Sequence, residues 1–437
     1  MSESADRQVC LLIPEWSPVL TETKTVERPA SHPRRLSRPV AFAAIAAIFV
    51  TFSAAAAAPS PLYVVYQQEW GFSASTLTVI FAVYVAGLIA ALLVLGALSD
   101  HIGRRPVLAA AIVLEAVALV LFLTAGDVGV LLAARVVQGI ATGAAMTTLG
   151  ATLVDLNPPH APGRAGLING IAPIAGLAVG ALGCGALVQF GPSPTHFVYA
   201  VLLLGMIIAA VVVAAMPETS IRRPGGAASL KPRLGIPPRL RADVLALTPI
   251  IVASWALGGL YLSLGPSVAA GVFGLSSHLI GGFVVTLLCG TGAVTSYLLR
   301  RRPTGQVLVL AAVMLTAGAT ISIAGVELAS GVELAGGVEL AGVALAAAGT
   351  VVSGIGFGAS ALASFGTLAV LAAPHERGEL FAFALTIAYV AFSLPAVVAG
   401  LAAGSVGLHT TALVYGLLVA VLAAAALVAQ RPRVQRG

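Results

Sequence analysis

The chain has 437 residues, of which 59% are hydrophobic and only 9% are charged, and its mean hydropathy is +1.01. Soluble domains carry about 25% charged residues, so this composition cannot supply a water-facing surface, and it excludes a soluble enzyme. The net charge of +6 comes from residues that lie between apolar runs, without the pattern of a nucleic-acid-binding surface. We therefore expect no nucleic acid partner.

Residues 1–39 are polar and basic, with no short apolar core near the start. They predict a retained, disordered cytoplasmic tail rather than a cleaved secretory signal. Twelve apolar runs follow, most of them long enough to cross a hydrocarbon layer of about 30 Å. The sequence thus predicts an all-α membrane protein with twelve transmembrane helices, approximately at 40–63, 74–97, 107–126, 128–152, 165–190, 196–216, 244–270, 276–299, 305–325, 343–372, 380–403 and 409–430.

The positive side chains lie on one side of these runs. With the amino terminus inside, 22 of the 23 Lys and Arg residues fall in cytoplasmic segments, and the remaining one, Arg135, lies within the fourth run. The external connections carry acidic residues but no Lys or Arg. Under the positive-inside rule, this distribution predicts that both termini are cytoplasmic, and we expect the plasma membrane.

A segment at 217–243, rich in Pro, Gly and Arg, divides the chain six runs to six. It predicts an N-terminal half at 40–216, a cytoplasmic linker, a C-terminal half at 244–430 and a short cytoplasmic tail at 431–437. Two parallel six-helix halves are the repeat pattern of one large transporter fold, in which the substrate site lies between the halves.

The two halves repeat two landmarks at different offsets. Arg104-Arg105-Pro106 returns as Arg301-Arg302-Pro303, whereas Pro159-His160 returns as Pro374-His375, and the offsets of 197 and 215 differ by 18 residues. Three tandem hexamers of the type GVELAG occupy 325–342 and account for that difference. We interpret them as a duplication in the external loop between the ninth and tenth spans, a neutral insertion rather than an acidic functional patch.

The loop after the second run reads Gly96-Ala-Leu-Ser-Asp100-His-Ile-Gly103-Arg104-Arg105-Pro106-Val107. Gly96 permits a close approach of helices, Gly103 permits a turn with positive φ, and Pro106 suits the first turn of the next helix. Asp100 can cap a helix or bond to a neighbouring helix N-terminus. This loop closely resembles the signature loop of the major facilitator superfamily.

The resemblance implies a gating loop composed of Gly96, Asp100, Gly103, Arg104, Arg105 and Pro106. In the family this loop docks against the other half when the protein faces outward, so Asp100 would meet the start of the eleventh span. Glu379 lies at that start and would partly repel Asp100. The alternative is a positive anchor at the membrane surface combined with a tight turn.

The fourth run carries Arg135-Val-Val-Gln138-Gly139, which resembles the second motif of the family, whose arginine is associated with proton coupling. An intramembrane Arg needs a partner, because burying it costs about 2.5–3.5 kcal/mol or more. Glu115 in the third run lies at a similar depth, with a difference of about 3 Å along the helices. We predict a Glu115–Arg135 pair that a proton could open, with a permanent structural pair as the alternative.

The fifth run spaces Pro173, Gly176 and Gly180 at intervals of three and four, a pattern that allows close helix packing and a kink. It resembles, imperfectly, the Gly-Pro motif of antiporter members of the family, and plain Gly-rich packing is the alternative. In this fold the first, fourth, seventh and tenth spans face the centre. Candidate cavity residues are Ser53, Trp255, Tyr261, Ser360 and Ser364, whereas Tyr63, Tyr66 and Trp70 fit an interfacial aromatic belt.

No Cys or His spacing indicates a metal site or a disulfide framework, and no Walker-type loop offers a nucleotide site, so we expect neither cofactor nor metal. These features predict a monomeric secondary transporter, not an enzyme, whose partners are a small molecule, protons and the lipid bilayer. Proton-coupled efflux of a lipophilic or weakly polar molecule is the main hypothesis. The alternatives are a symporter that imports a metabolite and a non-transporting, receptor-like member of the fold.

Overall fold

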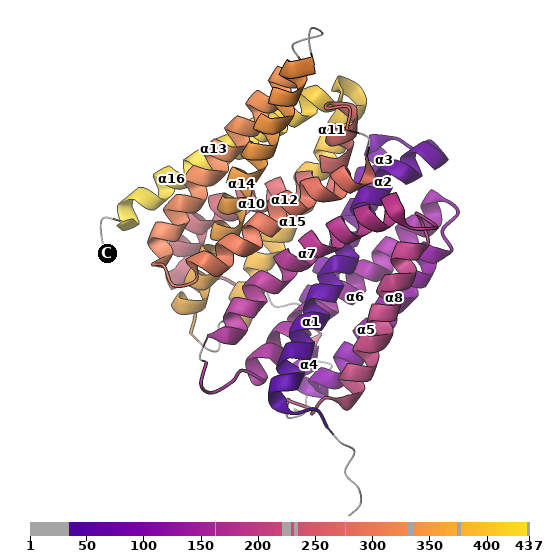
Figure 1. Cartoon of the computed structure of the whole chain (residues 1–437). Helices are drawn as coiled ribbons and strands as arrows, with labels where there is room; N and C mark the ends of the chain where they lie inside the picture. The colour runs from indigo at the N-terminus through magenta and orange to yellow at the C-terminus, as the bar shows by residue number, and fades with distance from the viewer. Residues whose placement is uncertain are drawn as a thin grey trace, which may run out of the picture. The chain divides into compact units, whose positions relative to one another are not determined.

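The computed structural model describes residues 35–161, 163–220, 229–230, 235–275, 277–330, 336–373 and 377–434. Twelve of its helical segments are long and apolar enough to cross a membrane (Figure 1). They match the twelve predicted runs, and the largest extension is in the first span, which continues to Trp70. Most of the predicted leader, most of 221–234 and the Pro374-His375 landmark lie outside the described residues.

The first half contains six spans, the first of which is broken. Its helices are α1 (Arg38–Ala57), α2 (Pro59–Trp70), α3 (Ala74–Leu95), α4 (Leu98–Ile102), α5 (Arg104–Leu123), α6 (Val128–Asp155), α7 (Arg164–Phe190) and α8 (Phe197–Ala215). The break between α1 and α2 falls at Ala58, because Pro59 and Pro61 have no N–H to donate to the preceding turn.

The second half repeats the six-span arrangement. It begins with the 3₁₀ turn η1 (Pro238–Leu240) and continues with α10 (Arg241–Ser263), α11 (Gly265–Gly271), α12 (His278–Leu299), α13 (Thr304–Ser330), α14 (Gly336–Leu371), α15 (Arg377–Val406) and α16 (Leu408–Val434). The predicted fold class, an all-α membrane protein with two six-helix halves, is confirmed.

Two of the three tandem hexamers lie in helices rather than in the predicted loop. Residues 325–330 are the last turns of α13, and residues 337–342 are among the first turns of α14, while 331–335 lie outside the described residues. Each of these two hexamers contains several good helix formers and a Gly that permits close packing, so it continues the helix beside it.

Small residues hold α13 and α14 together as an antiparallel hairpin. A Cβ placed on Gly318 would lie 2.3 Å from the backbone N of Ser353, and one placed on Gly342 would lie 2.9 Å from that of Ala329. The two members of each pair are equally far along the chain from the tip. Shortening the hairpin at its tip therefore leaves the deeper pairs in register.

Deletion of 325–342 should leave membrane insertion and transport intact, since it removes only the tip of the hairpin and spares the Gly318–Ser353 contact. Size-exclusion profiles in detergent and flux in vesicles would measure this. Gly318→Val in the same hairpin is the contrast variant and should destabilise the protein, because its side chain would collide with backbone. Complete loss of transport in the deletion variant would contradict the interpretation of a neutral insertion.

The main contacts between the halves are those of α7 with α12, which lie side by side in Figure 1, and of α3 with α15. We call the end of the bundle at which α1 begins the near end, and the opposite end, at which α2 finishes, the far end. The hydrogen bonds between these pairs lie toward the far end: Thr286 Oγ1 donates to the carbonyl of Ala178 at 2.9 Å, and Ser75 Oγ donates to that of Gly400 at 3.3 Å. The halves are thus closed against each other at the far end.

Candidate functional site

At the near end, ion pairs within the first half hold the loop between α3 and α5. Arg104 Nη1 lies 2.6 Å from Asp100 Oδ1, and Arg104 Nε lies 3.1 Å from Asp155 Oδ2 at the end of α6. Gly103 adopts the predicted positive φ, at 105°. Asp100 thus pairs with Arg104 in this conformation. Within the described part of the chain, no ion pair joins Asp100 to the start of α15, where Glu379 is exposed.

Gly96 does not serve the close helix approach that the sequence suggested. A Cβ placed on Gly96 would lie 2.4 Å from the carbonyl oxygen of Leu92 in its own turn, whereas Thr147 Cγ2 on α6 would be 3.8 Å away, an ordinary contact. Gly96 is therefore required by the tight end of α3. Pro106 lies in the first turn of α5, as predicted.

The N-terminus of α5 is capped by Glu218, which the sequence analysis missed. The Glu218 carboxylate accepts hydrogen bonds from the backbone N–H groups of Arg104 at 2.8 Å and Arg105 at 3.1 Å. Arg105 in turn donates to the carbonyls of Val213 and Ala214 at the end of α8. The capping role considered for Asp100 thus belongs to Glu218, since Asp100 is engaged by the side chain of Arg104.

Glu218→Ala should lower the free energy of unfolding by about 1–3 kcal/mol, because it leaves two backbone donors of α5 without their charged acceptor. Glu218→Gln retains an acceptor oxygen without the charge, so its free energy of unfolding should lie between those of the parent protein and of Glu218→Ala. Thermal unfolding in detergent would measure both effects. Unchanged stability in the alanine variant would show that water replaces the carboxylate without cost.

Within the first half, Arg135 on α6 is 1% exposed and lies among polar groups of three helices. Its Nη1 donates to Gln138 Oε1 at 2.7 Å and to the carbonyl of Ala56 at 3.2 Å, and its Nη2 donates to the hydroxyl of Tyr63 on α2. Gln138 Nε2 donates to the carbonyl of Ala55 at 3.1 Å. These acceptors offset the cost of an arginine inside the membrane.

The break between α1 and α2 frees one of these acceptors. In a continuous α-helix the Ala55 carbonyl would accept from the N–H four residues later, at position 59, and Pro59 has no N–H. The carbonyl is therefore available to the side chain of Gln138. A main-chain carbonyl of the first span, left free by the break, thus positions the Gln138 side chain of the fourth span.

Glu115 on α5 is fully buried and belongs to the same network, but it does not pair directly with Arg135 as predicted. No ion pair within 4.0 Å joins these two described residues. Instead, Gln138 Nε2 donates to Glu115 Oε1 at 2.9 Å, while Gln138 Oε1 accepts from Arg135. Glu115 and Arg135 thus reach the same side chain, but Gln138, one helical turn from Arg135, lies between them.

Three aromatic rings surround the Arg135 guanidinium. Its Cζ lies 5.3 Å, 5.2 Å and 5.7 Å from the ring centroids of Tyr63, Tyr84 and Phe122. Such ring faces attract a cation, and more strongly where water is excluded. Gly139 brings Tyr84 into place, since a Cβ at Gly139 would lie 2.1 Å from the Tyr84 carbonyl oxygen. Arg135, Gln138 and Gly139 therefore act as one local unit.

Two of the three aromatic residues expected in the interfacial belt lie inside the protein. Tyr63 is 1% exposed and Tyr66 is 2% exposed, so the belt assignment is wrong for both. Tyr63 binds Arg135, and the Tyr66 hydroxyl donates to that of Tyr199 at 3.3 Å. Trp70 is partly buried and stacks on Tyr66. The sequence signal that could have found Tyr63 is the need of Arg135 for an additional acceptor.

The predicted glycine pattern of the fifth span packs α7 against α1. A Cβ on Gly176 would lie 2.4 Å from Ser53 Cβ, and one on Gly180 would lie 2.2 Å from the carbonyl oxygen of Ala54. Pro173 lies inside α7 near the start of this contact. Ser53, a cavity candidate, is accordingly 2% exposed in the α1–α7 contact, and its hydroxyl donates to the carbonyl of Phe49 at 3.0 Å.

The remaining cavity candidates fall into two groups. Ser360 and Ser364 are each 1% exposed, and the Ser360 hydroxyl donates to Ser254 Oγ at 3.0 Å between α10 and α14. The Tyr261 hydroxyl shares a hydrogen bond of 2.8 Å with Thr350 on α14. Trp255 is only partly buried and contacts other aromatic rings. Trp255 is thus the candidate that lies in an aromatic cluster, with contacts to Phe365, Tyr389 and Phe392.

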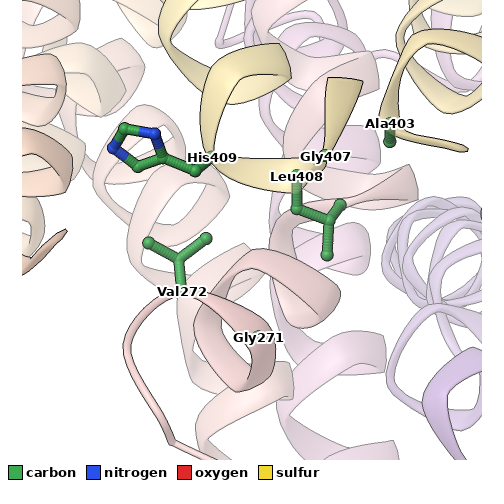
Figure 2. A pocket seen from close by; sticks show the side chains of 6 residues that line it. All are labelled: Gly271, Val272, Ala403, Gly407, Leu408 and His409. Atoms are coloured by element: carbon green, nitrogen blue, oxygen red, sulfur yellow. The ribbon is translucent and has the colours of Figure 1, made fainter. Parts of the chain in front are cut away.

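A surface hollow of about 530 Å³ lies at the far end, between α11 and the turn that joins α15 to α16 (Figure 2). Its lining is apolar apart from one imidazole, and it contains no predicted cavity residue: Gly271, Val272, Ala403, Gly407, Leu408 and His409. Within the described part of the chain, no group of three or more His, Cys, Asp or Glu side chains could hold a metal ion.

The twelve spans, the two halves and the buried polar network define a helical membrane transport protein. The family model described as Major Facilitator Superfamily matches residues 40–332, which is more than half of the chain. The chain therefore belongs to the Major Facilitator Superfamily, and its class is that of a transporter rather than an enzyme.

Similarity to individual relatives is low. The chain is 31% identical over 115 residues to the transporter paaT of Penicillium rubens, covering 26% of this chain and 21% of the relative. It is 27% identical over 269 residues to the multidrug resistance protein MdtL of Salmonella paratyphi C, covering 58% of this chain and 65% of the relative. The chain thus spans less than two thirds of the length of either relative.

Solved structures with the same fold cover nearly the whole chain. The nucleoside transporter NupG matches with a TM-score of 0.65 at 13% identity, covering 90% of this chain and 100% of that one. A bacterial homologue of the human lysosomal transporter Spinster, in an inward-facing and occupied conformation, matches with a TM-score of 0.66 at 13% identity, covering 92% and 98%. At these identities the likeness shows the fold alone.

Proposed function

We propose that this protein is a proton-coupled exporter of small, lipophilic or weakly polar molecules that works by alternating access. We further propose that it acts as a monomer in the plasma membrane with both termini in the cytoplasm. The one-sided distribution of Lys and Arg supports this orientation. The similarity to a relative named as a multidrug resistance protein favours efflux. The observation that carries proton coupling is the buried chain Glu115–Gln138–Arg135.

The amide of Gln138 can report the protonation state of Glu115 to Arg135. With Glu115 ionised, the Gln138 amino group donates to Glu115 and its carbonyl faces Arg135, as observed. Glu115 Oε2 is buried without a hydrogen-bond partner, so a proton can be added there without breaking an existing bond. Once protonated, the acid can turn its O–H toward the amide oxygen, and that contact requires a flipped amide with its N–H groups toward the guanidinium. In this step, which follows protonation, the hold on Arg135 weakens.

The conformation supports a cycle in which the two ends open in turn. The halves are closed at the far end by α7–α12 and α3–α15, while Asp100 and Arg104 pair within the first half at the near end. When the near end closes, Asp100 becomes available to the other half, as the gating-loop hypothesis requires. We propose that release of Arg135 from Gln138 triggers the change from the conformation closed at the far end to the one closed at the near end.

Glu115→Gln should abolish transport driven by a pH gradient while preserving substrate exchange, because Gln fills the same space and still accepts from Gln138 but cannot carry a proton. Flux in vesicles with an imposed pH gradient and counterflow without one would measure the two activities. Glu69→Gln, on an acid near the end of α2, is the matched control and should behave as the parent protein. Full gradient-driven flux in Glu115→Gln would show that another group carries the proton.

The alternatives differ in the direction and existence of flux. In inside-out vesicles, an exporter that exchanges substrate for protons accumulates substrate when the lumen is acidic. A symporter that imports a metabolite moves substrate out of the lumen together with protons under the same gradient. A receptor-like member would show neither substrate flux nor ligand-stimulated proton movement.

A further inference from the structure

Aromatic side chains from three helices of the second half form a cluster in which the sequence had singled out only Trp255. The Trp255 ring on α10 lies 5.0 Å from that of Tyr389 and 5.9 Å from that of Phe392, both on α15, measured between ring centroids. Phe365 on α14 lies 6.5 Å from Trp255. All three contacts of Trp255 are edge-to-face, so neighbouring rings do not stack on the faces of the indole.

The cluster faces the interior of the bundle. On α15 four exposed apolar residues within the span form one stripe, which would face lipid: Val390, Leu394, Val398 and Leu401. At 100° per residue, Tyr389 shares a different face with buried Phe392 and Ala396, on average about 135° from the exposed stripe. Tyr389 is nevertheless only partly buried, as are Trp255 and Phe365. The partial exposure of Tyr389 is therefore not contact with lipid.

The other half closes this cluster on one side. Phe392 lies 5.1 Å from Phe81 on α3, measured between ring centroids, and α3–α15 is one of the two pairs that join the halves toward the far end. A ligand at Trp255 would thus be separated from the far end while the halves are closed there. Two successive aromatic contacts, Trp255–Phe392 and Phe392–Phe81, connect Trp255 to α3, the helix that carries Tyr84.

The three helices that carry the cluster contribute no charged side chain to it. Residues 244–263, 340–371 and 380–406, which form the membrane parts of α10, α14 and α15, include no Asp, Glu, Lys or Arg. Nearby polar groups are hydroxyls, of which Ser254 and Ser360 bond to each other. A charged ligand would lose its hydration there without a counter-charge, whereas a neutral aromatic ring would gain ring contacts.

We propose that Trp255, Phe365 and Tyr389 form the surface that selects the substrate, and that this surface takes flat, uncharged aromatic molecules. This proposal rests on the proposed transport function and narrows its substrate class. The rings hold the ligand by stacking and edge contacts, and the membrane parts of α10, α14 and α15 offer an anion no counter-charge. Removal of the ring of Phe365 or Tyr389 should weaken the binding of aromatic ligands and leave the binding of saturated lipophiles of similar size unchanged.

Tryptophan fluorescence can test this directly, because the chain has only three Trp residues, Trp16, Trp70 and Trp255. A variant with Trp16→Phe and Trp70→Phe retains Trp255 as its single reporter. Acridone, a neutral planar tricycle, should quench the Trp255 emission in a saturable manner in purified protein. A saturated tricycle of similar size should not displace acridone at equal concentration, and an aromatic sulfonate should not compete.

In the same background, Phe365→Leu and Tyr389→Leu should each raise the acridone Kd about three- to tenfold, the range expected for loss of one ring contact. Tyr389→Phe should bind as the background protein does. Tyr297→Leu, on an exposed ring of α12, is the matched control and should change nothing. Unchanged melting temperatures in detergent would show that the leucine variants are folded.

Unsaturable quenching, or equal affinity in Phe365→Leu and Tyr389→Leu, would overturn the proposed surface. Vesicle flux keeps this outcome separate from failure of the proposed function. Proton-driven flux of a saturated lipophile without acridone binding at Trp255 would contradict the aromatic surface alone. Saturable acridone binding without any proton-linked flux would contradict the proposed function alone.

Discussion

Arg135→Lys should reduce proton-driven transport at least 100-fold although it keeps the positive charge. The guanidinium donates in separate directions to Gln138, to the Ala56 carbonyl and to Tyr63, and it lies between three aromatic rings. A lysine ammonium cannot occupy all these positions at once. Loss of two hydrogen bonds to a charged group, at about 1.5–3 kcal/mol each, exceeds what a 100-fold change requires.

Vesicle flux under a pH gradient would measure this effect, with thermal unfolding in detergent as a parallel readout. Arg164→Lys is the matched control, because Arg164 also lies over an aromatic ring, that of Phe42, but at the start of α7. That substitution should change flux less than about twofold, as surface substitutions usually change stability by no more than about 0.5 kcal/mol. Parental flux in Arg135→Lys would mean that the charge alone is sufficient.

Gly282→Ala should open the far end of the protein. A Cβ at Gly282 on α12 would lie 2.3 Å from the Ala181 carbonyl oxygen on α7, so the closed arrangement could persist only if one helix moved. Overpacking of this kind costs about 1–3 kcal/mol, which lowers the closed population about 5- to 150-fold relative to the open one. Each half can still fold, since the clash lies between the halves.

Gly290→Ala on the same helix is the matched control, because its Cβ would make an ordinary contact of 3.8 Å with Ala178 Cβ. Cysteines introduced at Gln189 and Ser277, whose side chains hydrogen-bond at 3.3 Å across the same contact, would report closure through crosslinking in a background without native cysteines. Crosslinking should be rapid in Gly290→Ala and slow in Gly282→Ala. Equal crosslinking rates in the two variants would show that α7 and α12 accommodate the methyl group without separating.

The twelve spans could be predicted because the length and hydropathy of each run are local properties, and the positions of Lys and Arg provided a second, independent signal. The turn at Gly103 could be predicted from the conformational freedom of glycine. Glu218 could not, because its role depends on the end of α8 lying beside the start of α5, and these positions are 113 residues or more apart in the chain.

The buried network shows where depth estimates reach their limit. Counting residues from a turn placed Glu115 and Arg135 at one level, but the rotation of each helix decides which side chains meet, and Gln138 lies between them. Tyr63 was assigned to the interface for the same reason, since its distance along the helix says nothing of the face it occupies. The first and third hexamers were misread as a loop because their tandem repetition hides their helical composition.

The proline-induced break after Ala57 has a consequence for how mutation can act on the protein. The acceptor that Gln138 uses on the first span is a main-chain oxygen, released because Pro59 has no hydrogen to offer it. Replacement of the side chain at position 55 leaves that oxygen in place, whereas Pro59→Ala restores a main-chain donor that competes with Gln138 for it. A substitution at position 59, which is small, uncharged and outside every motif, would therefore impair the protein through a main-chain hydrogen bond and not through a lost side-chain contact.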